Sequence, residues 1–127
     1  MAETFPEVIK LARQYKFEDI AVVTNGSFLD AKKVYQALLD YASTIRISIY
    51  DWNSDSCSGI DQTLGKIERM RERVEKSGSK MQIGISVLTS DDMASSLISI
   101  GKLIRSAGAH WIYFHPTCIK WDQGLPE

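Results

Sequence analysis

Two kinds of hydrophobic pattern alternate along the chain. Short apolar runs, rich in β-branched residues, predict buried strands, and between them apolar residues recur at the three-to-four-residue spacing of amphipathic helices. The strands are expected near residues 20–24, 45–50, 81–88 and 111–114, and each follows a helical pattern. The predicted order is therefore αβαβαβαβ.

Polar residues and glycines suggest where these helices begin and end. Residues 4–7, Thr-Phe-Pro-Glu, fit a capping box at the start of the first helix, which is expected to end near Lys16. Gly78 and Gly108 follow the third and fourth helical patterns and predict their ends. Caps for the later helices are expected at Asp30, Asp61 and Ser90.

Strands that alternate with helices at intervals of about 30 residues imply right-handed crossovers and a parallel sheet. The predicted fold class is α/β, built from repeated βα units. A length of 127 residues, without a linker or low-complexity tract, predicts one domain over residues 1–127.

The composition of the chain limits the classes of partner that it can bind. A net charge of −1, from 15 basic and 16 acidic residues, gives no basic surface for nucleic acid or anionic lipid. The chain has neither an apolar stretch near the ~20 residues of a membrane span nor a secretory signal pattern, which predicts a cytoplasmic protein. Its two cysteines, Cys57 and Cys118, are expected to be reduced thiols.

Loops at the carboxyl ends of parallel strands meet on one side of a sheet, where ligands usually bind. Hydroxyl and amide groups dominate there, which suits a polar small molecule. Asn25-Gly26 is also an ordinary turn dipeptide, however, and this interpretation is favoured from the Thr-Asn-Gly tripeptide alone. The candidate groups at the four strand ends are Thr24 and Asn25, Ser48 with Tyr50 and Asp51, Ser86 with Thr89, and His115.

Other chemistry is poorly supported. Glycine-rich phosphate-binding motifs and H-E-x-x-H are absent. His110 and His115 flank an extended strand and are expected about 17 Å apart at ~3.3 Å per residue, so no metal site is predicted from them and Cys118. The polar stretch 51–60 is a candidate functional loop, although a solvated loop is the simpler interpretation. The charged run 66–73 is interpreted as a solvated helix face that needs no partner.

Four segments carry a resemblance to a known family: "FPEVIKLA" (5–12), "AVVTNGSFL" (21–29), "IRISIYD" (45–51), and "MQIGISVL" followed by "TSDDMASSL" (81–97). In this order and spacing, residues 5–117 resemble the middle of a radical S-adenosylmethionine (radical SAM) enzyme domain. The resemblance implies a partial (half) TIM-type (β/α) barrel. It also implies a parent enzyme that reductively cleaves SAM to a 5′-deoxyadenosyl radical for hydrogen abstraction.

The resemblance also implies cofactor-binding residues. Thr24 and Asn25 correspond to positions near the methionyl end of SAM, Ser48 to a serine that approaches the ribose, and Ser86 to a polar residue on the next strand. Some relatives carry a lysine where this chain has Gly84. The family's C-x-x-x-C-x-x-C motif, which holds a [4Fe-4S] cluster, and its G-G-E segment are absent. We therefore expect a fragment that lacks the cluster and is inactive alone.

Alternatives remain open at this stage. A non-enzymatic α/β interaction module would be distinguished by a flavodoxin-like strand order, and a phosphate-ligand enzyme would use helix amino termini at Ser27 and Ser90. An open sheet curved for a barrel is expected to expose an apolar concave face and two unpaired edges. A homodimer that covers this face is one solution, beside flattening into a sandwich or exchange of an element.

Overall fold

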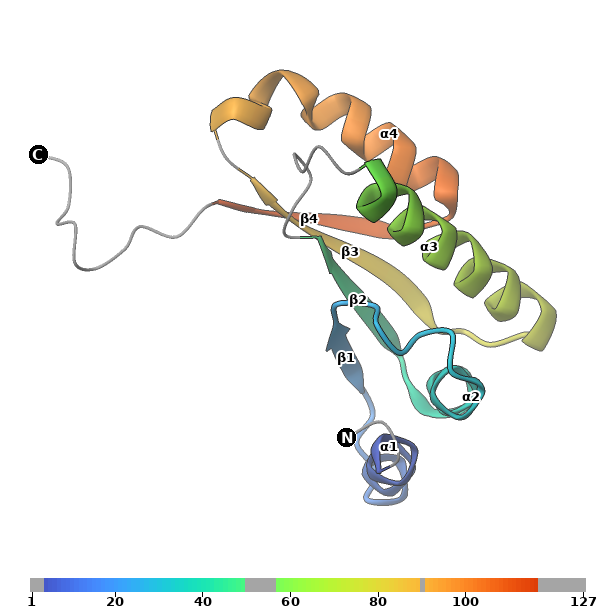
Figure 1. Cartoon of the computed structure of the whole chain (residues 1–127). Coiled ribbons are helices and arrows are strands. Elements are labelled where there is room, and N and C mark those ends of the chain that lie inside the picture. The colour runs from blue at the N-terminus through green and yellow to red at the C-terminus, as the bar shows by residue number, and fades with distance from the viewer. Residues whose placement is uncertain (1–3, 50–56, 90, 117–127) are drawn as a thin grey trace, which may run out of the picture.

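The computed structural model describes residues 4–49, 57–89 and 91–116, and its elements follow the predicted alternation (Figure 1). A short 3₁₀ helix at Asp91–Ser96 precedes the last α-helix. The helices are α1 (Phe5–Gln14), α2 (Lys32–Tyr41), α3 (Cys57–Ser77) and α4 (Leu97–Ala107), and the strands are β1 (Ala21–Thr24), β2 (Thr44–Ile49), β3 (Gln82–Thr89) and β4 (Trp111–Pro116).

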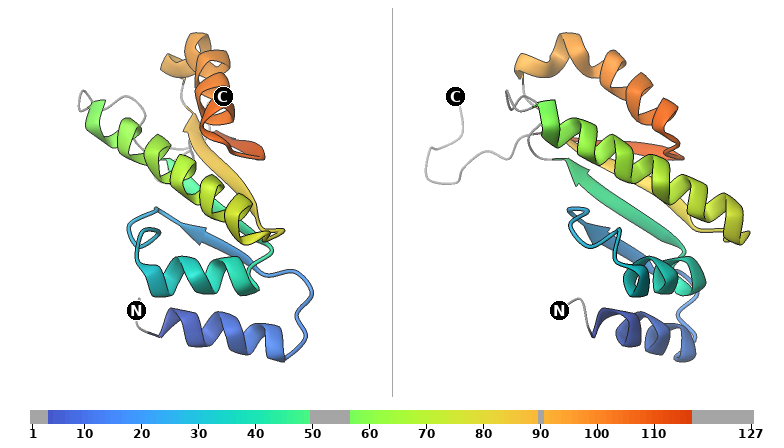
Figure 2. Two further views of the ribbon diagram at one scale, coloured as in Figure 1. Left: turned by 90° about the vertical axis from the view of Figure 1, so that its right-hand side faces the viewer. Right: turned by 45° about the vertical axis from the view of Figure 1, so that its right-hand side comes forward.

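The four strands form one parallel sheet in the order β1-β2-β3-β4, so each strand pairs with the next one in the chain. All four helices lie on the same side of the sheet, as two further views show (Figure 2). The prediction of an α/β fold with repeated βα units and a parallel sheet is confirmed. The strand bounds differ from the predicted ones by one or two residues, and β4 extends far enough to include His115.

The hydrophobic core lies between the sheet and its helices. Alternate residues of the central strands point into it, and Ile45, Ile47, Ile83 and Ile85 are each 0% exposed. From the helices, Leu38, Ile67, Met70, Ile100 and Ile104 pack into the same cluster. β1 was predicted to be buried, but its Val23 is 54% exposed because the sheet has helices on one face only.

Helix ends set by glycine are predicted correctly. α3 ends at Ser77 and is followed by Gly78 with φ +69°, while α4 ends at Ala107 and is capped by Gly108 with φ +114°. Both residues adopt the left-handed conformation that glycine enters without steric cost. These ends follow from backbone sterics alone, which explains why sequence suffices to find them.

Side-chain caps are predicted poorly. Thr4 is the N-cap of α1 but its side chain forms no cap hydrogen bond, so the threonine half of the predicted capping box is not formed. The N-cap of α2 is Ala31 instead of Asp30, and Asp61 lies inside α3, which begins at Cys57. The predicted cap Ser90 lies outside the described residues.

Among the helices that the structure describes, none combines the length and the hydropathy needed to cross a membrane.

Candidate functional site

The face of the sheet opposite the helices is the candidate site. Because side chains alternate between faces along a strand, the residues next to the buried isoleucines point to this side. We call it the open face; in register order its members are Ala21 and Val23 of β1, Thr44, Arg46 and Ser48 of β2, Gln82, Gly84, Ser86 and Leu88 of β3, and Trp111, Tyr113 and His115 of β4. The expectation of an apolar uncovered face holds only in part, since polar residues occupy half of these positions.

A shallow hollow of about 230 Å³ lies on the open face. Its polar lining consists of Arg46, Ser48, Ser86 and His115, and the apolar residues Val23 and Leu88 complete it. Most of these residues belong to the carboxyl-terminal halves of their strands, which is where parallel sheets usually bind ligands. The hollow can therefore hold a polar group of a small molecule.

Two of the four predicted cofactor contacts meet in this hollow. Ser48 and Ser86 are register partners on adjacent strands, so their Cα atoms are expected about 4.8 Å apart. Ser86 is 6% exposed, and Ser48 is half-buried. Two hydroxyl groups on the same side of neighbouring strands can contact one ligand group together.

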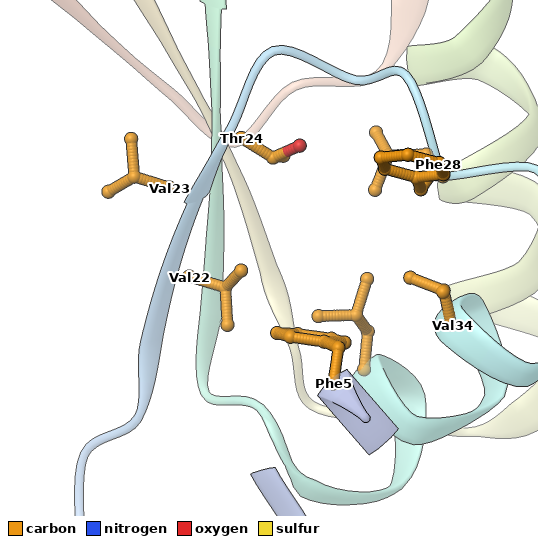
Figure 3. Close-up of a pocket in the computed structure, with 8 residues that line it drawn as sticks. Phe5, Val22, Val23, Thr24, Phe28 and Val34 are labelled. Carbon is orange, nitrogen blue, oxygen red and sulfur yellow. The ribbon is translucent and has the colours of Figure 1, made fainter. Parts of the chain in front are cut away.

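Thr24 does not join them. It is the register partner of Ile47, whose side chain is buried under the helices, and it lines an apolar pocket of about 160 Å³ between β1 and the helices. Figure 3 shows Val22 and Thr24 directed toward Phe28 and Val34, whereas Val23 points to the opposite side. The Thr24 hydroxyl accepts a hydrogen bond from the Gly26 N–H at 3.0 Å.

Asn25 serves the turn after β1. Its Oδ1 accepts hydrogen bonds from the Ser27 N–H at 3.0 Å and from the Ser27 hydroxyl at 2.7 Å. This is an Asx turn, in which the side chain satisfies the backbone of a tight loop, and Gly26 within it has φ +89°. The helix amino terminus that the phosphate-ligand alternative places at Ser27 is not there, since α2 begins at Lys32. The turn interpretation of Thr-Asn-Gly thus accounts for the hydrogen bonds of these residues.

Arg46 is the charged residue at the centre of the open face. Its Nε is buried and has no hydrogen-bond partner, the one such side-chain atom in the described part of the chain. An unsatisfied buried donor costs about 1–3 kcal/mol, and more when the group is charged. Sequence reasoning missed this residue, although the alternation Ile45-Arg46-Ile47-Ser48-Ile49 was a signal that one face of β2 is polar.

An indole ring covers part of the open face beside Arg46. A Cβ atom at Gly84 would overlap the six-membered ring of Trp111, so the absence of a side chain at position 84 makes room for the tryptophan. On the same strand as Trp111, the rings of Tyr113 and His115 meet edge to face with centroids 4.2 Å apart. Aromatic side chains thus border the hollow along β4.

A charged cluster on the helix side corrects the interpretation of the run 66–73. Arg69 forms a bidentate pair with Asp30, with distances of 3.0 and 2.8 Å, and Arg73 reaches the same carboxylate at 3.2 Å. Arg73 also lies over the ring of Tyr35, 4.0 Å from its centroid. The hydrogen bond from Arg69 and the nearby positive charges lower the pKa of Asp30. These residues join α3 to the loop before α2.

His110 lies at the opposite end of the sheet from the hollow. Its Nδ1 accepts a hydrogen bond from the Ile83 N–H at 2.9 Å, and its Nε2 contacts the guanidinium of Arg71. Burial, followed by the charges of Arg71 and Arg105, lowers the pKa of His110. The ring is therefore held neutral as a structural link between β3 and β4.

The described residues contain no group of three or more His, Cys, Asp or Glu side chains that could hold a metal ion. The loop candidates Tyr50, Asp51, Trp52 and Asp55, and also Cys118, lie outside the described residues.

No protein-family model, curated protein or solved structure matches the chain, so the geometry of the open face is the basis for its functional assignment.

Proposed function

We propose that the chain is a half-barrel of the radical SAM type, and that its open face is the part of the barrel interior that contacts S-adenosylmethionine. The observation that carries the proposal is the consecutive parallel strand order with helices on one face only. A (β/α) barrel is built in this way, with side chains of the uncovered face pointing inward. A flavodoxin-like sheet instead reverses its strand order and has helices on both faces.

The flanks of the helix layer support a barrel that continues on both sides. Val8 and Leu11 of α1 and its C-cap residue Tyr15 recur at helical spacing on one side of the helix, and they are 61%, 51% and 75% exposed. On α4, Ile98 is 75% exposed and Leu103 48% exposed. In a closed barrel each helix packs against a helix on either side, and apolar residues at both ends of this layer suit such neighbours.

Within this proposal, Ser48 and Ser86 contact the nucleoside part of SAM. Their hydroxyl groups share the hollow, and a hydroxyl can either donate to or accept from a ribose. Thr24 and Asn25 act indirectly, because their polar atoms hold the turn between β1 and α2. This assignment narrows the four residues suggested by the family resemblance to two direct contacts.

The iron-sulfur cluster of the family does not fit the residues of this chain. A site-differentiated [4Fe-4S] cluster needs three closely spaced cysteines, and the chain has only Cys57 and Cys118. We therefore derive no radical step from these residues. The proposed role of the chain is to bind the cofactor, with any cluster held by another segment or polypeptide.

Titration of the isotopically labelled chain with SAM, followed by NMR, tests the proposal. We expect chemical-shift changes centred on the open face, and about tenfold weaker binding by the double variant Ser48→Ala/Ser86→Ala, because two hydroxyl hydrogen bonds are lost. The matched control Ser99→Ala/Ser106→Ala removes two exposed serines of α4 and should bind like the parent chain. Changes confined to the helix side, or no changes at millimolar SAM, would overturn the proposal.

A second candidate is a non-enzymatic module that binds a protein through the open face. The exposure of Val23 and Tyr113, at 54% and 48%, favours it, and a second copy is one possible partner. Failure to bind SAM, combined with a dimer in sedimentation equilibrium whose formation protects the open-face amides from hydrogen exchange, would support this candidate.

A further inference from the structure

We infer that Arg46 forms an oxyanion-binding site on the open face, which takes the carboxylate or phosphate group of a small-molecule ligand. The inference rests on the proposed function in placing a small molecule on this face, and it adds the chemical group that the ligand must carry. The first observation is the buried Nε of Arg46, which has no hydrogen-bond partner in the described part of the chain.

The charge of Arg46 is not balanced on its own face. None of the described open-face positions on the four strands carries an aspartate or glutamate. Arg46 also takes part in none of the ion pairs found in the described residues, whereas Arg69, Arg71 and Arg73 on the helix side each pair with a carboxylate. An arginine that is partly withdrawn from water, and that pairs with no carboxylate among the described residues, is suited to an external anion.

The neighbours of Arg46 across the sheet offer no polar partner. Its register partners are Val23 on β1 and Gly84 on β3. Gly84 has no side chain, and the indole of Trp111 lies over it. Apolar groups therefore flank position 46 on both sides, and a guanidinium with less access to water interacts more strongly with an anion.

Along the strand, by contrast, the neighbours of Arg46 can help to bind the rest of such a ligand. Ser48 lies two residues further on the same face of β2, about 6.6 Å away at the rise of a strand, and Ser86 is its partner on β3. Both line the hollow with Arg46. The planar guanidinium can donate two parallel hydrogen bonds to an oxyanion, while the serine hydroxyls contact the nucleoside of the same ligand.

Two nucleosides that differ only in the α-carboxylate test the inference. SAM carries this group, and decarboxylated SAM keeps the sulfonium and the amino group of SAM without it. We expect the chain to bind SAM at least about tenfold more tightly, as an added charge-assisted bidentate contact requires. Arg46→Gln should bind both compounds alike, with unchanged affinity for decarboxylated SAM. Arg46→Lys, which keeps the charge and loses the planar fork, should retain part of the preference.

Lys102→Gln is the matched control, because it removes one positive charge from the exposed surface of α4 and should keep the full preference for SAM.

Titration with inorganic phosphate is a separate experiment, in which the Nε–Hε resonance of Arg46 should shift. An unaltered preference for SAM in Arg46→Gln would overturn the inference and leave the proposed function standing. If neither nucleoside binds, the proposed function fails. The inference then stands if phosphate shifts the Arg46 resonance, and is overturned if it does not.

Discussion

The two faces of the sheet are made from the same four strands and serve opposite purposes. At the centre of the covered face, on β2 and β3, lie isoleucine and valine side chains that are almost completely buried under the helices. The open face combines a cation, several hydroxyl groups and aromatic rings, and much of it remains accessible. The difference teaches that every second residue of a strand stabilises the fold, while the residues between them are available for binding.

β2 is the clearest instance, because its successive residues lie in turn on the covered face and on the open face. Ile45, Ile47 and Ile49 are buried, while Arg46 and Ser48 between them are only partly buried. A shift of register by one residue would place the cation in the core and the isoleucines in water. The pairing of β2 with β3 is therefore strongly specified, and the position of the hollow is specified with it.

The largest expected effect comes from truncating the covered face. We expect Ile47→Ala to reduce the free energy of unfolding by about 2–5 kcal/mol, because it leaves a cavity in a site that is fully buried. Ser48→Ala, one residue further on the opposite face, should change it by less than about 1 kcal/mol. Urea denaturation of the two variants measures this difference. Equal losses would mean that the open face is as important for stability as the core.

A smaller effect is expected at the position where the open face is closely packed. Gly84→Ala forces the Trp111 indole to move and should cost about 1–3 kcal/mol. A second substitution, Trp111→Ala, should abolish this cost, so the double-mutant cycle should show strong coupling. Gly101→Ala is the control: a Cβ there meets nothing within 4 Å, and alanine favours the helix. Additive effects at positions 84 and 111 would contradict the packing described here.

The smallest expected effect is a pH dependence at the other end of the sheet. Because the folded chain lowers the pKa of His110 below its ordinary value of 6.5, the unfolded chain binds the proton first as the pH falls. Stability should therefore be full above about pH 6.5 and decrease as the pH falls through that value toward the folded pKa, where the loss levels off. Thermal unfolding between pH 7.5 and 5.5 measures this decrease. It should be weaker in His110→Gln, which keeps the other histidine, His115. An identical pH profile in the variant would exclude His110 as the cause.

Prediction from sequence succeeded where a local rule decides the structure. Apolar runs located the four strands, and the alternation of strands with helices gave the parallel sheet. Gly78 and Gly108 fixed two helix ends through their left-handed backbone conformation. Asp30 shows the limit of such rules, because a carboxylate next to a helix start can cap it, and in the folded chain it pairs with Arg69 and Arg73 of α3 instead.

The candidate site shows the same division. The sequence identified Ser48 and Ser86 as polar residues on neighbouring strands, and the register places them side by side. It also placed Thr24 with them, because proximity to the carboxyl end of a strand says nothing about which face a side chain occupies. Arg46 was overlooked, since an arginine within a strand gains significance only when its partners are known.

By itself, the sequence of this protein determined where most of its helices and strands lie and that the strands run parallel. Hydrophobic periodicity and backbone sterics act over a few residues, so they can be found in the sequence. Only the tertiary structure decided that one face of the sheet is left without helices, that Thr24 lies on the covered side, and that the Nε of Arg46 has no hydrogen-bond partner among the described residues. These features depend on contacts between residues far apart in the chain, and no local pattern contains that information.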